Sequence, residues 1–143
     1  MAVQINRGRV EIYQRDANGL NADLLELLTL PNLESCHTIV LGIQAELKLE
    51  TVTAILETSL ARTLKVLECQ EILMRPETLE QLLEFELDSL TLAGGSAYEY
   101  PYPDPNSFPT LGPAHLAVLR SHQRLRQLKK LYLPNQYLER DTI

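Results

Sequence analysis

The side chains in this sequence that could do chemistry are three histidines, two cysteines and a column of acidic residues. His115 and His122 are seven residues apart, which on a helix separates them by about 10 Å and prevents them from sharing a metal ion. Cys36 and His37 are adjacent and face different ways in a helix or a strand, and no second ligand pair follows at zinc-site spacing. We therefore expect no metal site and no cofactor.

The same residues give no catalytic signature. Glu80, Glu84 and Asp88 follow one another at four-residue steps, and such a column on a helix is typical of a solvated or docking face. The pair Gly94-Gly95 ends a predicted helix instead of opening one, so it does not form a phosphate-binding loop. The alternative left open is a cysteine–histidine nucleophilic pair assembled by the tertiary structure. We predict that the chain is not an enzyme.

A basic segment near the C-terminus is a stronger signal. It has no acidic residue between Asp104 and Glu139. Its like-charge pairs at four-residue spacing favour a position beside negative charge. That charge could come from the acidic residues between Glu77 and Asp88, from an acidic partner protein or from nucleic acid. The basic residues are Arg120, Arg124, Arg126, Lys129 and Lys130.

A segment rich in tyrosine and proline, residues 94–112, precedes the basic segment. Proline favours an extended backbone that loses little entropy on binding, and tyrosine is common at binding hot spots. The alternative is a surface loop whose tyrosines pack back onto the protein. As partner-binding residues we predict the aromatic side chains of this segment together with four of the basic residues: Tyr98, Tyr100, Tyr102, Phe108, Arg120, Arg124, Lys129 and Lys130.

Length and charge limit the class of protein. The 143 residues suit a single domain, 1–143, and the net charge is −6. Residues 1–112 carry 7 basic and 17 acidic groups, and residues 113–143 carry 6 basic and 2 acidic groups. This acidic balance disfavours general nucleic-acid binding. Because no signal peptide, membrane span or disulfide framework is evident, we expect a cytoplasmic protein with buried free thiols and no membrane partner.

The elements that would position these residues are predicted to be mostly helical. No Gly, Pro, Asn or Asp occurs from Ile43 to Arg75, which indicates helix over 44–74. Residues 38–49 also alternate between apolar and polar, the period of a strand. Further helices are expected from Asn21 to Leu30, from Pro76 to Gly94, and over 113–133. A short hairpin is expected around Asn6-Arg7-Gly8, and no internal repeat is evident.

The fold expected from these patterns is predominantly α, an irregular four-helix bundle with a small N-terminal β element. The alternative is an α+β domain that uses residues 38–49 as a strand. In its acidic, leucine-rich composition the chain resembles small accessory and assembly factors, although no motif carries that resemblance. We expect a non-enzymatic adaptor or assembly factor that docks a peptide or helix of a larger partner. The alternative is a nucleic-acid-associated regulator that uses the basic helix, and self-association stays open.

Overall fold

The computed structural model describes residues 3–93, 113–122 and 127–133, and its central element is a five-stranded parallel β-sheet. The strands lie in sequence order, and each pairs only with its neighbours in that order. They are β1 (Arg9–Tyr13), β2 (Thr38–Gly42), β3 (Val66–Gln70), β4 (Ser89–Ala93) and β5 (Lys130–Tyr132). The helices are α1 (Ala17–Leu27), α2 (Leu49–Leu56), α3 (Leu60–Thr63), α4 (Pro76–Leu82) and α5 (Pro113–Ser121), with a 3₁₀ turn, η1 (Leu33–Ser35).

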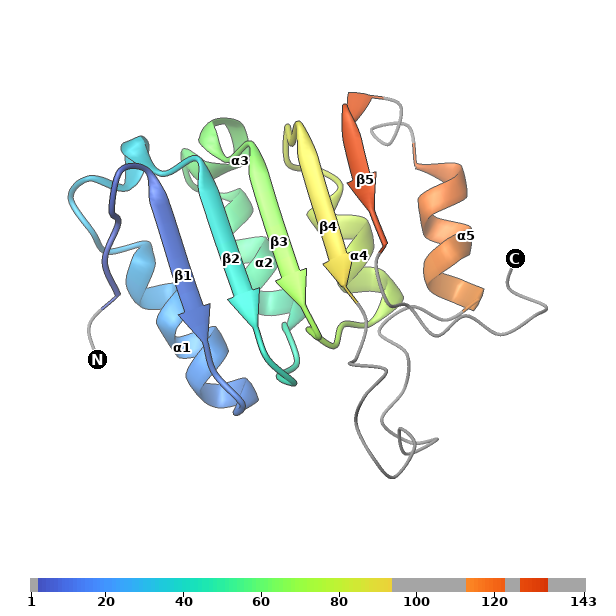
Figure 1. Cartoon of the computed structure of the whole chain (residues 1–143), viewed down its shortest axis with the longest axis horizontal. Helices are drawn as coiled ribbons and strands as arrows, with labels where there is room; N and C mark the ends of the chain where they lie inside the picture. Colours follow the sequence, from blue (N-terminus) through green and yellow to red (C-terminus); the bar gives the residue numbers. More distant parts are fainter. Residues whose placement is uncertain (1–2, 94–112, 123–126, 134–143) are drawn as a thin grey trace.

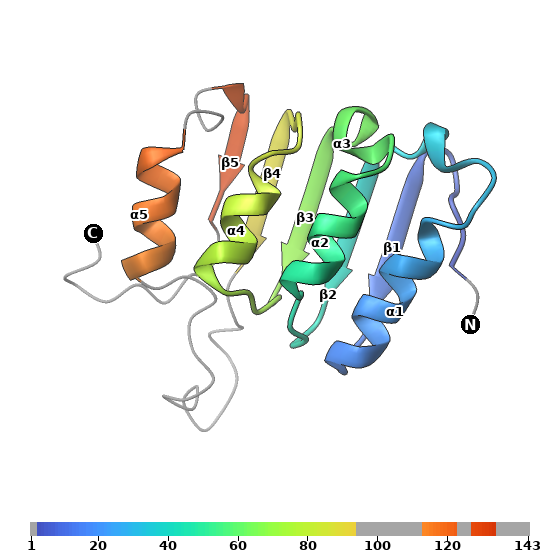
Figure 2. The same ribbon diagram turned by 180° about the vertical axis from the view of Figure 1, so that it is seen from behind.

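The helices form a second layer on one side of the sheet. Figure 1 shows the strands side by side in front of the helices, and Figure 2 shows the helices from behind. Helix α1 contacts α2, α2 contacts α4, and α4 contacts α5, so the helix layer follows the same order as the strands. Within the described residues the other face of the sheet has no helix over it. We call it the open face.

The first four strands and the helices between them repeat one structural unit. Arg9 pairs with Thr38, Thr38 with Val66, and Val66 with Ser89, spacings of 29, 28 and 23 residues. Such a stack of strand–helix units is the arrangement of α/β solenoids, in which each unit contacts chiefly its neighbours. This repeat is structural and has no fixed period, and the sequence analysis did not predict it.

The repeat is visible in the buried residues. In each of the first four strands the second and fourth residues point toward the helices and are buried, and two positions three residues apart are buried in each of the helices α1, α2 and α4. The strand positions are Val10 and Ile12, Ile39 and Leu41, Leu67 and Cys69, and Leu90 and Leu92. The helix positions are Leu24 and Leu27, Val52 and Ile55, and Leu79 and Leu82. Together they form one continuous core.

The start of each strand from β2 to β5 is held by the same backbone arrangement. One carbonyl accepts hydrogen bonds from two successive amides at the start of the next strand, at distances from 2.8 to 3.1 Å. The accepting carbonyls belong to Gly8, His37, Lys65 and Asp88. Gly8 has a φ of +77°, and a Cβ there would collide with the His37 ring, so this close approach requires glycine.

The predicted four-helix bundle was wrong, because the chain is an α/β structure with a parallel sheet. The error lies mainly in residues 44–74, where the sequence indicated one helix. The chain reverses there without glycine, because Gln44 and Glu71 take left-handed backbone angles, with φ values of 65° and 55°. These two residues follow successive strands, and Gln44 N donates to the Glu71 carbonyl at 2.8 Å. The alternative of a strand within 38–49 was correct only for Thr38–Gly42.

Other helix limits also differ from the expectation. The helix expected over 113–133 is α5 as far as Ser121, but Lys130–Tyr132 is the edge strand β5. Helix α4 begins at Pro76 as expected but ends at Leu82, before strand β4. Helix α1 is capped by the Asp16 carboxylate, which accepts from the amides of Asn18 and Gly19, instead of by Asn21.

The N-terminal β element is present as β1, although the expected hairpin is reduced to a tight turn. Only one antiparallel bridge, between Asn6 and Arg9, is formed there, and β1 then pairs in parallel with β2. Among the described residues, no helix is long and apolar enough to cross a membrane.

Candidate binding surface

The open face is built from the first, third and fifth residues of the strands. Because the strands are parallel and in register, these residues form three rows across the sheet. The first row is Arg9, Thr38, Val66, Ser89 and Lys130. The second row is Glu11, Val40, Glu68, Thr91 and Tyr132, and the third is Tyr13, Gly42, Gln70 and Ala93. The surface therefore joins residues that are far apart in the sequence.

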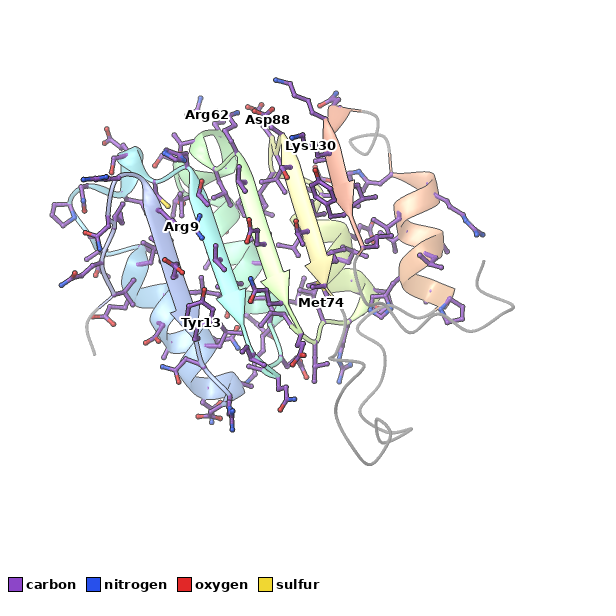
Figure 3. The ribbon with its side chains drawn as sticks, in the orientation of Figure 1. Arg9, Tyr13, Arg62, Met74, Asp88 and Lys130 are labelled. Atoms are coloured by element: carbon purple, nitrogen blue, oxygen red, sulfur yellow. The ribbon has the colours of Figure 1, made fainter. Side chains whose placement is uncertain are left out.

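Two exposed tyrosines stand at the opposite edges of the open face. Tyr13 on β1 is 54% exposed and Tyr132 on β5 is 50% exposed. Figure 3 shows Tyr13 on the front of the sheet, with Arg9 above it on the same strand. The outer strands are four strand spacings apart, about 19 Å. A large exposed aromatic side chain at each edge is a feature of a binding surface, because tyrosine buries much area at little entropic cost.

The Tyr13 side chain is held in place by its surroundings. Its hydroxyl donates to Glu11 Oε1 at 2.8 Å, and Arg9 Nε lies 3.4 Å from Glu11 Oε2. A Cβ on Gly42 would lie 2.9 Å from Tyr13 Cδ1, so the edge of the ring lies against the neighbouring strand at the residue that has no side chain. The hydrogen bond to Glu11, together with partial burial, raises the pKa of Tyr13, and hydrogen bonding to Tyr13 lowers the pKa of Glu11.

The centre of the open face is polar and only partly covered. Glu68, Gln70 and Thr91 are half-buried, and Glu68 is directly opposite Thr91 in the register. On the other side of Glu68 lies Val40, which is fully buried although no described helix covers this face. The centre therefore presents a carboxylate, an amide and a hydroxyl next to the buried side chain of Val40.

Of the residues predicted to bind a partner, the structure describes three, and one of these lies on the open face. Tyr98, Tyr100, Tyr102, Phe108 and Arg124 are outside the described residues. Arg120 lies on α5, Lys129 precedes β5, and Lys130 is the first residue of β5 and belongs to the open face. The structure thus separates the described basic residues instead of placing them along one helix.

The sequence left three sources of negative charge open for the basic segment: acidic residues of the same chain, a partner protein or nucleic acid. The structure places acidic residues of the same chain beside part of this segment. Lys129 Nζ lies 3.9 Å from Asp88 Oδ1, and His122 Nε2 lies 3.1 Å from Glu84 Oε1. The Asp88 carbonyl also accepts from the amides of Lys129 and Lys130. These contacts tie the segment before β4 to α5 and β5. The acidic residues Glu84 and Asp88 lie after the end of α4, not on one helix face as expected.

The two cysteines are buried, and two of the histidines form hydrogen bonds within the chain. Cys36 and Cys69 are buried free thiols, and burial raises the pKa of Cys36 to about 11 and that of Cys69 to about 12. His37 Nδ1 is 2.8 Å from the Thr38 hydroxyl, and the buried His115 Nε2 donates to the Met74 carbonyl at 2.6 Å. In the parts of the chain that the structure describes, no three His, Cys, Asp or Glu side chains are placed to hold a metal ion.

A small pocket lies at the edge of the sheet where the strands begin. Its volume is about 210 Å³, below the roughly 300–1,000 Å³ of typical small-molecule sites. Its ionic groups are partly neutralised by one another, since Lys65 Nζ lies 4.0 Å from Glu86 Oε2. The pocket is therefore smaller than a typical small-molecule site and partly charge-neutralised. It is lined by Lys65, Leu83, Phe85, Glu86, Leu87, Asp88, Gln127 and Leu128.

The sequence analysis missed the residues of the open face, Tyr13, Glu68 and Tyr132 among them. A signal existed, since alternating residues at 9–13, 66–70 and 89–93 carry polar or aromatic side chains between apolar ones. Only the register of the sheet brings these stretches together.

Comparison of the chain with protein-family models, with curated proteins and with solved structures finds no match. Any function must therefore be inferred from the open face itself.

Proposed function

We propose that this chain is a non-enzymatic protein-binding adaptor or assembly factor whose open sheet face docks an extended segment of a larger partner. The observation that carries the proposal is the open face itself, with an exposed tyrosine at each outer strand and half-buried polar groups between them. Stacked strand–helix units characteristically use one long face for binding.

The dimensions of the open face suit a short extended segment. A segment that crosses from β1 to β5 covers about 19 Å, which about six extended residues span. Tyr13 and Tyr132 would contact the two ends of such a segment and supply most of the apolar contact. Nucleic acid is the poorer occupant, since Glu11 and Glu68 would place carboxylates against phosphates.

The test compares two variants of the whole chain as baits in an extract of the source organism. Tyr13→Ala combined with Tyr132→Ala removes both aromatic contacts. Leu25→Ala is the matched control, because Leu25 is also an exposed apolar residue, at 44%, but lies on α1. A captured protein is then purified and its affinity measured by calorimetry, and the fold of each variant is checked by circular dichroism.

We expect the double tyrosine variant to bind the partner about thirtyfold more weakly, the loss of one hot spot of about 2 kcal/mol. The Leu25→Ala variant should bind like the wild-type chain. Equal loss in both variants, unchanged affinity in the double variant, or capture that nuclease treatment removes would each contradict the proposal.

A further inference from the structure

Among the described residues, Glu68 differs from Glu11, the other carboxylate of the second row, in having no hydrogen-bond or ion-pair partner. Glu11 accepts from the Tyr13 hydroxyl and lies beside Arg9. Among the described residues, none donates a hydrogen bond to the Glu68 carboxylate or forms an ion pair with it. Glu68 is nevertheless half-buried and lies on the central strand β3.

Two polar residues near Glu68, Gln70 and Thr91, also have side chains without a hydrogen bond among the described residues. Thr91 is one strand spacing from Glu68, about 5 Å, and Gln70 is two residues further along the strand, about 7 Å. A single group with several N–H donors could therefore reach the carboxylate, the amide oxygen and the hydroxyl together. The guanidinium of arginine and the ammonium of lysine are such groups.

The Tyr13 ring lies against β2, the strand next to the one that carries Glu68. The edge of the ring lies against Gly42 of β2, and a Cβ on Gly42 would also lie 3.7 Å from the Gln70 Cβ. The face of a tyrosine ring can attract a cation.

A segment that covers the open face must bury Glu68 further. Removing water from an unpaired carboxylate costs several kcal/mol, so binding requires a compensating charge at this position. We propose that the partner segment supplies a lysine or arginine side chain that pairs with Glu68 at the centre of the open face. This inference rests on the proposed function and adds the chemistry of the partner. Glu68 then sets specificity, because a segment without a cation at that position leaves the carboxylate unpaired.

The test uses a display library of random peptides long enough to cross the sheet. Three full-length baits are compared: the wild-type chain, Glu68→Arg, and Glu26→Arg as the matched control on α1. Selected peptides are synthesised and their affinities measured, together with versions in which the basic residue is changed to glutamate. Circular dichroism and thermal melting verify that each bait is folded, and sedimentation velocity measures self-association.

We expect peptides selected by the wild-type chain and by Glu26→Arg to share a lysine or arginine, and Glu68→Arg to weaken their binding about a hundredfold. The glutamate versions should bind Glu68→Arg better than they bind the wild-type chain. Isolation of binders without a basic residue, or of binders that tolerate Glu68→Arg, would overturn the inference and leave the proposed function standing.

Two further outcomes are decisive. If no peptide binds the wild-type chain, the proposed function fails and this inference fails with it. If the wild-type chain self-associates and Glu68→Arg abolishes the association, the occupant is a second copy of this chain, and the inference of a separate partner is wrong.

Discussion

At the scale of single residues, burial decides what the two cysteines can do. Cys36 Sγ is 3.8 Å from the Thr38 carbonyl, and both thiols lie in the apolar core, where the thiolate is poorly solvated. Burial therefore raises the pKa of both groups, to about 11 and about 12. Since the nucleophile is the thiolate, the geometry opposes the cysteine–histidine alternative considered from the sequence.

These pKa values predict a loss of stability at alkaline pH. From about pH 8.5, the ordinary value of a cysteine, up to about pH 11 the folded chain keeps thiol protons that the unfolded chain has lost. The free energy of unfolding should therefore fall as pH rises through this window. Urea titrations at several pH values would measure it, with Cys36→Ala/Cys69→Ala as the reference. An equally steep fall in the reference would assign the effect to other groups.

At the scale of elements, Asn21 joins the first two strand–helix units. Its side-chain amide donates to the carbonyls of Ala17 and Glu46 at 2.7 and 2.8 Å, and its Oδ1 accepts from the Lys48 amide at 3.0 Å. The residue is buried in α1 and contacts the segment that leads into α2. The polar residue that the sequence suggested as a helix cap thus connects two helices.

Removing the Asn21 side chain should lower the free energy of unfolding. We expect Asn21→Ala to lower the free energy of unfolding by about 2 kcal/mol, because it leaves buried backbone groups of the α1–α2 connection without partners. Asn18→Ala is the control, since Asn18 is exposed and its side chain accepts one 3.5 Å bond, from Lys48 Nζ. It should change stability by less than about 0.5 kcal/mol. Chemical denaturation measures the free energy of unfolding of both variants. A similar loss in the two would contradict the role of Asn21 in connecting α1 to the segment before α2.

At the scale of the whole molecule, the stacked arrangement implies that stability is unevenly distributed. Strand β3 has a neighbour on each side, whereas β5 is the short last strand of the described sheet. Leu67 on β3 is 3% exposed, and Leu131 on β5 is only partly buried. In solenoids, neighbour contacts supply much of the stability of each unit, so the centre and the edge should respond differently to truncation.

Truncating these two leucines tests the unequal distribution. Leu67→Ala should destabilise the chain by about 2–5 kcal/mol and speed hydrogen exchange in all strands. Leu131→Ala should cost less and speed exchange mainly in β5, while amides in β1 to β3 keep their protection. Hydrogen exchange followed by mass spectrometry separates the two patterns. Uniform acceleration by Leu131→Ala would indicate one fully cooperative unit instead.

Some features of the fold followed from the sequence. The free buried cysteines and the start of α4 at Pro76 were correct. These features depend on local chemistry, because proline fixes its own backbone angle and apolar side chains leave water wherever they are placed. The alternation from Thr38 onward also indicated the strand that became β2.

The sheet itself was decided by tertiary packing. Residues 64–74 carry apolar side chains at spacings that fit a helix, yet Val66–Gln70 is a strand with β2 and β4 on either side. Periodicity cannot separate a short buried strand from a buried helix, and the backbone hydrogen bonds of a parallel strand come entirely from its neighbours.

The sequence by itself determined which side chains are apolar, charged or aromatic. Only the tertiary structure decided that Tyr13, Glu68 and Tyr132 share one surface. Their positions are separated by many residues and are joined by the register of parallel strands. That register results from the stacking of whole strand–helix units, a long-range packing effect that no local pattern encodes.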